Sequence, residues 1–325
     1  MSTLTQEQTQ KAAALLQGLR DELGKAVIGQ AAVIEEVLIG LLAEAHVLLE
    51  GVPGLGKTLL VKALAKAFSG HFARIQFTPD LMPSDVVGHT FFDASSQSFV
   101  TRKGPVFTHL LLADEINRAP AKTQSALLEA MQEYQVTLEG AASPLPKPFM
   151  VLATQNPIEQ EGTYPLPEAQ LDRFLLKVRI DYPDAREEAA LTRGMTERRT
   201  GATLGVDEVS QVIGPQQVEV LQRATALVDV DERVLDYAVR IVRATREHPG
   251  FSIGAGPRGS IALVRAARAA ALLQGRAFIT PDDIRRVALP ALRHRVALAP
   301  EVEIEGSTAD SLLLSLLDSV PAPRA

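Results

Sequence analysis

The chain has 325 residues, which favours two domains over one, and 46% of them are hydrophobic, an ordinary fraction for a globular protein with a sizeable core. Its formal net charge of -6 argues against a surface built mainly for nucleic acid. The absence of cysteine excludes disulfides, thiol catalysis and cysteine metal sites, and the six histidines form no pair at helical spacing. Because the N-terminus lacks a signal-peptide pattern and no apolar run approaches the ~18 residues of a membrane span, we expect a cytoplasmic protein without membrane insertion.

The first part of the chain favours two helices. Apolar residues recur at helical spacing over residues 5–23, and a second helix is expected over 31–43, after the break at Gly24. Between them lies the segment Val27-Ile28-Gly29-Gln30. An apolar pair before a glycine can simply pack in a core or can wrap an adenine ring. Its position one helix before the glycine-rich segment favours the adenine contact.

The glycine-rich segment is Gly51-Val52-Pro53-Gly54-Leu55-Gly56-Lys57-Thr58, which fits G-x-x-x-x-G-K-[ST] at every fixed position. It follows the apolar run 46–49, a predicted strand, and opens a predicted helix over 59–68. Glycines let the backbone N–H groups turn toward an anion, and the helix N-terminus adds positive dipole there. Lys57 would reach the β- and γ-phosphates and the Thr58 hydroxyl would bind Mg²⁺. The alternative is a glycine-rich turn with a lysine nearby.

The sequence therefore predicts a site for a nucleoside triphosphate. The residues expected to contact it are Ile28, Gly29, Gln30, Gly51, Pro53, Gly54, Leu55, Gly56, Lys57, Thr58 and Leu59.

A second group of candidate residues follows downstream strands. After a strand over 73–78 and a hairpin over 89–104, the apolar run 109–113 is typical of a central parallel strand. It ends in Asp114 and Glu115, at the edge where open α/β sheets bind ligands. Asp114 can hold Mg²⁺, through water, and Glu115 can polarise an attacking water as general base. The alternative for the two acids is a pair that is only solvated. The hairpin over 89–104 is either a flap over the core or a contact for a partner.

The next elements are a helix over 121–132, a second hairpin over 134–148 and a buried strand over 149–154. Asn156 follows that strand and can donate from its amide to a γ-phosphate or hold the attacking water. Arg173 precedes a last strand over 174–180, and by itself reads as a surface ion pair with Asp172.

A change in composition at 182–184 divides the chain. Before it we expect an α/β domain over 1–184, after it a connector over 185–215 that includes a charged helix, and then a helical domain over 216–325. Helices are predicted at about 216–227, 231–248, 259–274 and 281–295, the last with an N-cap at Thr280 and proline at its first position. Arg258 lies at the start of the third of these helices, a position suited to contact with an anion. The alternative is an exposed loop arginine.

Together these segments resemble the AAA+ ATPases, and specifically the MoxR family, over about residues 25–300. The resemblance is carried by Val27-Ile28-Gly29-Gln30, the glycine-rich segment, and residues 77–85, 113–118, 153–157, 166–174 and 256–258. It implies a P-loop NTPase core with a parallel sheet and a C-terminal all-helical lid domain. It also implies that ATP and Mg²⁺ are the cofactors, with Thr58 and Asp114 at the metal.

The resemblance assigns the remaining roles residue by residue. Asn156 is similar to the sensor-1 residue, and Arg258 to the sensor-2 residue of the lid, which is expected to act with Lys57. Arg173 is similar to the arginine finger that acts on ATP bound by a neighbouring subunit. With Glu115, these three form the expected catalytic set. A finger used in trans implies a ring, expected to be a hexamer. The hairpins at 89–104 and 134–148 resemble the helix-2 insert and the hairpin before sensor 1.

The family resemblance also implies a chaperone-like remodeler that matures or loads metal into client protein complexes, often with a partner bearing a von Willebrand A domain. Two alternatives remain: a nucleotide-dependent switch that binds a partner and hydrolyses slowly, and a nucleic-acid translocase. The second is disfavoured because the chain is acidic and Lys147 is the only basic residue of the hairpin at 134–148.

Overall fold

Five parallel strands form the central sheet of the molecule. The computed structural model describes residues 4–52, 54–156, 162–196 and 205–323. The sheet has the order β2-β5-β8-β1-β9, with β1 Val47–Gly51, β2 Phe72–Gln76, β5 Leu110–Asp114, β8 Met150–Gln155 and β9 Leu176–Ile180. β1 pairs with both β8 and β9, and Leu48 is level with Ala153 and Lys177. All five strands were predicted, and their parallel pairing confirms the predicted α/β class.

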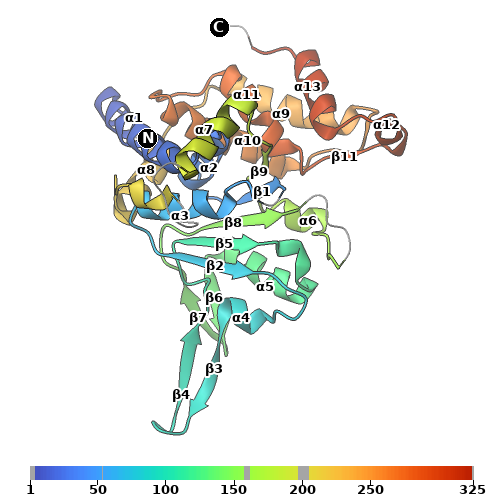
Figure 1. Cartoon of the computed structure of the whole chain (residues 1–325). Coiled ribbons are helices and arrows are strands. Elements are labelled where there is room, and N and C mark those ends of the chain that lie inside the picture. Colours follow the sequence, from blue (N-terminus) through green and yellow to red (C-terminus); the bar gives the residue numbers. More distant parts are fainter. Residues whose placement is uncertain (1–3, 53, 157–161, 197–204, 324–325) are drawn as a thin grey trace.

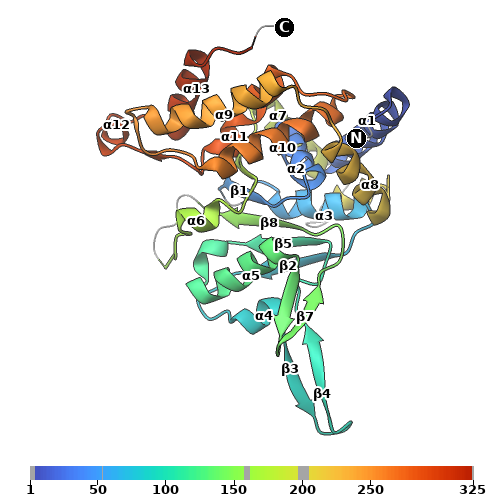
Figure 2. The same ribbon diagram turned by 180° about the vertical axis from the view of Figure 1, so that it is seen from behind.

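Helices cover both faces of this sheet, which explains why its inner strands β5, β8 and β1 consist mostly of consecutive buried apolar residues. Successive β1 residues enter different cores: Val47 and Leu49 pack in one cluster and Leu48 in the other. Figures 1 and 2 show the two layers on opposite sides of the sheet. One layer includes α1 Gln6–Ala26, α2 Ala31–Leu42 and α3 Lys57–Ala67, and the other includes α4 Pro83–Val87, η1 Ile116–Arg118 and α5 Ala121–Glu133.

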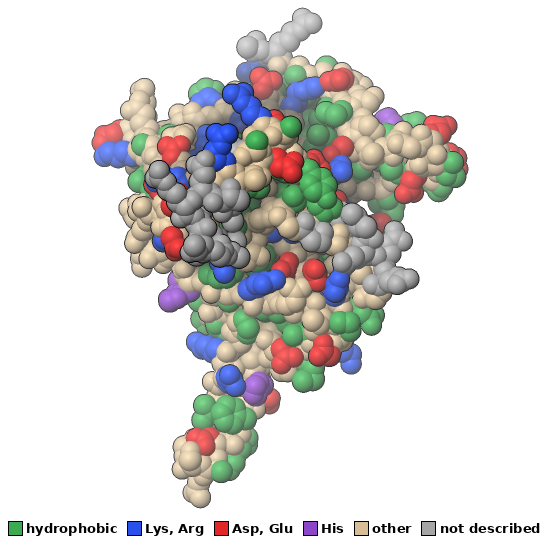
Figure 3. Space-filling model, in the orientation of Figure 1, with side chains coloured by type: hydrophobic (Ala, Val, Ile, Leu, Met, Phe, Trp, Pro, Cys, Tyr) green, Lys and Arg blue, Asp and Glu red, His purple; other side chains and the backbone are tan. Residues whose placement is uncertain are grey.

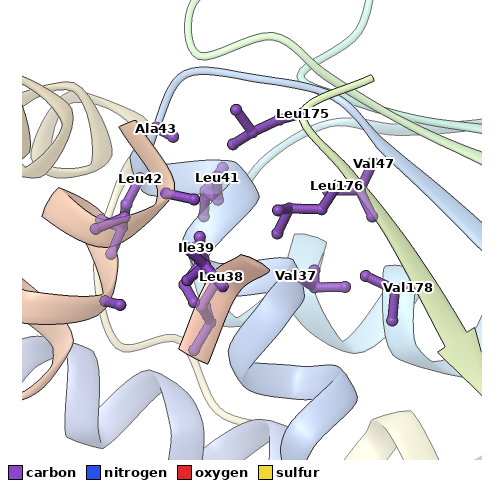
Figure 4. Packing of buried hydrophobic residues seen from close by; sticks show 14 of the residues in the cluster. Val37, Leu38, Ile39, Leu41, Leu42, Ala43, Val47, Leu175, Leu176 and Val178 are labelled. Atoms are coloured by element: carbon purple, nitrogen blue, oxygen red, sulfur yellow. The ribbon is translucent and has the colours of Figure 1, made fainter. Parts of the chain in front are cut away.

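The C-terminal helices continue the first layer. Their bounds, with those of the short elements before them, are α6 Glu168–Leu171, α7 Ala185–Thr196, η2 Gly205–Glu208, α8 Pro215–Ala226, α9 Glu232–Glu247, α10 Pro257–Leu273, α11 Pro281–Leu292, α12 Pro300–Ile304 and α13 Ala309–Ser319. α10 packs on α1 and α2, and α11 packs on β9, so the C-terminal helices share one hydrophobic cluster with the N-terminal helices and the sheet. Figure 4 shows apolar α2 side chains against Leu176 and Val178 of β9.

Three features of this region were not predicted. The chain forms α12, α13 and a short antiparallel pair of β10 Phe251–Ile253 with β11 Ala297–Leu298. α12 and the two strands are too short for a clear periodic pattern. The division of the chain at 184 and 215 stays a prediction, because α2 packs both on β9 of the sheet and on the C-terminal helix α10.

Two antiparallel hairpins were predicted. They are β3 Gly88–Asp93 with β4 Ser98–Lys103, and β6 Gln135–Leu138 with β7 Ala141–Pro144. The first extends away from the sheet and does not lie over it as a flap (Figures 1 and 2). It forms the narrow projection in Figure 3 and exposes Phe91, Phe92 and Phe99. Among the described residues, no helix has the length and apolar character that a membrane span needs.

A buried ion pair fixes the start of α11. Asp283 is 2% exposed, and its carboxylate accepts a hydrogen bond from Arg276 Nη1 at 2.7 Å and from the Thr280 backbone N–H at 2.7 Å. Burial alone raises the pKa of Asp283, but the hydrogen bonds from Arg276 and Thr280 outweigh it and lower that pKa below its usual value. The charged carboxylate therefore completes the capping box that begins the helix.

We expect Asp283→Asn to destabilise the protein by about 2–3 kcal/mol, less than for a fully buried pair because the Arg276 side chain is 25% exposed. The folded pKa lies below the unfolded value of about 3.9, so this contribution is present above that pH and is lost as the pH falls through the folded pKa. Thermal unfolding against pH measures it. Asp282→Asn, at the exposed neighbouring position, is the control. Equal melting-temperature shifts for the two variants would contradict the assignment.

Candidate functional site

The segment between β1 and α3 has the backbone of a phosphate-binding loop. Gly54 and Gly56 have φ values of 88° and 77°, in the left-handed region that favours glycine, and Gly56 is the N-cap of α3. A Cβ added at Gly51 would lie 2.6 Å from the Ile180 carbonyl, so β1 and β9 require glycine there. Pro53 lies outside the described residues. The first backbone N–H groups of α3 are thus directed at the space above the sheet edge.

Lys57 turns back onto its own loop. Its Nζ donates to the Gly51 carbonyl at 2.6 Å. Burial lowers the pKa of Lys57, although the nearby carboxylates of Asp114 and Glu115 oppose that shift. An ammonium that is half-buried beside two carboxylates and bonded to a single carbonyl is well placed to exchange that carbonyl for a phosphate oxygen.

Both predicted carboxylates lie at the end of β5, and Thr154 of β8 connects them. The Thr154 hydroxyl, 1% exposed, donates to Asp114 Oδ1 at 2.6 Å and accepts from the Glu115 backbone N–H at 2.8 Å. Glu115 has a φ of 55°, an uncommon value for a residue other than glycine, and this hydrogen bond holds it there. Thr154 therefore positions both acids, a role that its own stretch of sequence did not indicate.

Two side chains of β2 also contact these acids. Arg74 Nη2 lies 2.6 Å from Asp114 Oδ2, and Gln76 Nε2 donates to Glu115 Oε2 at 2.7 Å. Arg118 Nε lies 3.0 Å from the same Glu115 oxygen. The carboxylate of Glu115 is therefore held toward β2 and η1, and it must leave these partners before it can act on a ligand at the loop.

A cavity of about 700 Å³ joins these groups at the carboxyl edge of the sheet. Its polar end contains Lys57, Thr58, Asp114, Glu115 and Asn156, together with Arg74 and Gln76. Its other lining residues, which include the apolar side chains suited to a base, are Ala26, Val27, Ile28, Gln30, Gly54, Leu55, Gly56, Leu59, Tyr182, Pro183, Glu188 and Leu191. The sequence did not indicate Arg74, Gln76 or the residues after 181. Arg74 and Gln76 line the cavity because β2 lies next to β5, and the residues after 181 line it because of where the chain places α7.

Gly29 was predicted to contact the nucleotide, but in the structure the glycine has a different role. Gly29 does not line the cavity; its φ is 76°, and a Cβ there would lie 2.9 Å from Glu187 Cβ. The glycine lets α7 approach the loop before α2. Gln30, which follows, lines the cavity and donates to the Leu55 carbonyl at 2.9 Å.

The donor set fits a magnesium ion that arrives with a phosphate. Thr58 and Asp114 both line the polar end, and among the described residues no group of three or more His, Cys, Asp or Glu side chains could hold a metal ion. Mg²⁺ is commonly held by one or two protein oxygens, with water and substrate phosphate completing its octahedron. The two side chains would supply those oxygens.

The two arginines predicted to be catalytic lie elsewhere. Arg173 and Arg258 line a separate cavity of about 300 Å³, together with His46 and Asp172. His46 precedes β1 and Arg173 precedes β9, so this cavity is at the amino edge of the sheet. The five residues of β1 separate it from the loop by roughly 15 Å. The fold brings Arg173 and Arg258 together but brings neither to Lys57 of the same chain, although Arg258 was expected to act with Lys57.

Comparisons with known proteins agree with this geometry. The family model described as ATPase family associated with various cellular activities (AAA) matches residues 46–176, and the AAA lid domain model matches 243–315. Chaperone MoxR1 of Mycobacterium tuberculosis is 43% identical over 93% of this chain and 81% of its own. YeaC of Bacillus subtilis is 46% identical over 93% of each chain. A crystal structure from Cytophaga hutchinsonii is 41% identical, with a TM-score of 0.89 over 98% of both chains.

We expect Lys57→Met to weaken binding of a fluorescent ATP analogue by ~10–100-fold, since hydrogen bonds to charged groups are worth about 1.5–3 kcal/mol. Fluorescence titration with Mg²⁺ present measures the Kd. Lys62→Met removes the same charge one turn further along α3, outside the cavity lining, and is the matched control. Equal losses in the two variants would mean that overall charge, and not the loop, determines affinity.

Proposed function

This chain belongs to the MoxR family of AAA+ ATPases, and from that membership we propose that it hydrolyses ATP with Mg²⁺ to remodel or mature client protein complexes. The observation that carries the proposal is the large cavity at the carboxyl edge of the sheet. Its polar end brings together a loop lysine, two strand-end carboxylates and a strand-end amide, and its other end is suited to a base. The expected location is the cytoplasm, where ATP is made.

Within one subunit, the side chains would divide the work as follows. Lys57 and the first N–H groups of α3 bind the phosphates, and Thr58 and Asp114 hold the metal. Magnesium, when bound with ATP, neutralises charge on the phosphoryl oxygens. Asn156, 7% exposed, would orient the attacking water by its amide. Glu115 would leave Gln76 and Arg118 and accept the proton of that water as general base.

Between subunits, Arg173 and Arg258 would complete the site. Their shared cavity at the opposite sheet edge supports joint action on ATP held by a neighbouring copy. An arrangement in which one edge of each subunit meets the other edge of the next is head-to-tail, and it forms a ring when the rotation from one copy to the next closes. We propose a hexamer. An arginine supplied in this way is worth about 10³–10⁵ in kcat, so an isolated subunit is nearly inactive.

The hairpin β3–β4 is the proposed contact with the client or with a partner such as a von Willebrand A domain protein. It exposes three phenylalanines on a projection. Gln76, which releases Glu115 in the proposed cycle, ends β2, and the chain then leads through α4 to this hairpin. A change at the acid thus has a short covalent route to the projection. Metal insertion is the alternative form of this output, since the similar 38 kDa protein of Acidiphilium rubrum is named as a magnesium-chelatase subunit.

The second candidate function is a nucleotide-dependent switch, favoured by the hydrogen bonds that restrain Glu115 in this structure. Glu115→Gln separates the two functions. A remodeler with this substitution loses its effect on the client, whereas a switch stays in its ATP-bound state with the partner attached. A nucleic-acid translocase is disfavoured by the net charge of -6.

We expect the specific ATPase activity to rise with protein concentration, because the site is complete only between copies. Arg173→Ala should lower kcat by at least ~10³-fold and should also inhibit wild-type protein when the two are mixed. A phosphate-release assay over a concentration series measures both effects. Activity that is independent of concentration, with Arg173→Ala at the wild-type rate, would exclude a trans-acting finger and favour a monomeric switch.

A further inference from the structure

The guanidinium of Arg295, just after α11, is buried against the segment that contains Arg173. The Arg295 side chain is 4% exposed. Its Nε donates to Asp172 Oδ1 at 2.7 Å, its Nη2 to the Phe174 carbonyl at 2.6 Å, and its Nη1 to the Leu175 carbonyl at 3.1 Å. A further bond reaches the Asp172 carbonyl at 3.4 Å. One fixed fork of N–H donors thus holds the backbone on both sides of Arg173.

This arrangement is costly to build and therefore specific. Burial lowers the pKa of Arg295, and the Asp172 carboxylate opposes that shift. A buried guanidinium is tolerated only where carboxylate and carbonyl partners satisfy its donors, and here the 172–175 segment supplies most of them. Lysine has a single compact ammonium and cannot reproduce the fork.

Arg173 itself is only lightly held. Among the described residues, its side chain donates one hydrogen bond, from Nη1 to the Leu128 carbonyl on α5, at 2.6 Å. We call the contacts of Arg295 with residues 172–175 the clamp. Because the clamp fixes the backbone on both sides of Arg173, it largely sets the position and direction of that side chain, while the guanidinium of Arg173 can still move to a new acceptor.

Asp172 connects the same clamp to Arg258. Its Oδ2 lies 3.7 Å from Arg258 Nη1, and the Arg258 side chain is 56% exposed. Such an exposed, long ion pair contributes little stability, so Arg258 can leave it for a phosphate at small cost. Asp172 therefore holds a buried arginine with one oxygen and an exchangeable arginine with the other.

We propose that Arg295 and Asp172 are positioning residues that aim Arg173 and Arg258 at the ATP of the neighbouring subunit. The inference rests on the proposed ring ATPase. Neither residue touches that ATP: they act by fixing the 172–175 segment and by presenting Arg258 beside it. Loss of the clamp harms hydrolysis in the neighbouring subunit and leaves the nucleotide cavity of its own subunit intact.

Trans-complementation tests this inference. Arg295→Lys keeps the charge but removes the fork, and a comparable misplacement of a catalytic group costs about 10²-fold in rate. We expect the pure variant to lose about 10²-fold in kcat and to bind the fluorescent ATP analogue with the wild-type Kd. Mixed with Glu115→Gln protein it should regain activity. In an equal mixture roughly one interface in four pairs a working hydrolytic cavity with an intact arginine pair.

Two controls keep the outcomes distinct. Arg293→Lys changes a residue close to Arg295, 11% exposed, that donates to Asp310 and the Lys177 carbonyl but not to the 172–175 segment, and it should keep the wild-type rate. Arg173→Ala mixed with Glu115→Gln reports on the ring itself. If that pair fails to regain activity, the proposed trans function is wrong.

The proposed positioning role is wrong if Glu115→Gln protein rescues Arg173→Ala but not Arg295→Lys. It is also wrong if pure Arg295→Lys protein hydrolyses ATP at the wild-type rate. Should Arg295→Lys lose analogue binding through misfolding, Asp172→Asn, at a position 28% exposed, replaces it with the same two criteria.

Discussion

Burial of a parallel sheet on both faces leaves only its two edges for chemistry, and the rest of this molecule follows from that constraint. Val47, Leu48 and Leu49 of β1 all lie in hydrophobic clusters, so polar groups can gather only before or after the strand. The phosphate-binding loop follows β1 and His46 precedes it. The carboxyl edge thereby holds the nucleotide cavity and the amino edge holds the arginine cavity.

The C-terminal helices are joined to this sheet by more than apolar packing. Arg265 of α10 donates to the carbonyls of Ala43 and Glu44, which have no helical partners at the end of α2. Arg293 and Arg295 donate to carbonyls of β9 and of the segment before it. These arginines satisfy backbone groups that would otherwise be costly to bury. Movement of the helical domain against the core would break charged hydrogen bonds at the amino edge of the sheet.

Local signals predicted much of this arrangement. The glycine loop, the apolar runs and the polar residues that end β5 and β8 each lie within a few residues of sequence, and the structure brings Lys57, Asp114 and Asn156 into one cavity as expected. Thr154, Arg74 and Gln76 were missed because their roles depend on the order β2-β5-β8, which no local pattern contains. Arg295 was missed for the same reason: in sequence it is one of several arginines, and only the fold brings it beside Asp172, from which it is 123 positions away in the chain.

The two carboxylate oxygens of Asp172 explain how one residue can hold one arginine rigidly and leave a second arginine free to exchange partners. A buried, forked bond to Arg295 resists replacement, because a lost partner would leave a buried charge unsatisfied. The exposed contact with Arg258, at 3.7 Å, is screened by water and easily replaced. A site shared between subunits needs both properties: the finger must be in place before the neighbouring subunit presents its phosphate, and an arginine must still be able to move toward it. The buried contact of Asp172 with Arg295 lies in the core. The exposed contact of Asp172 with Arg258 lies at the rim of the cavity, where a second subunit would reach it.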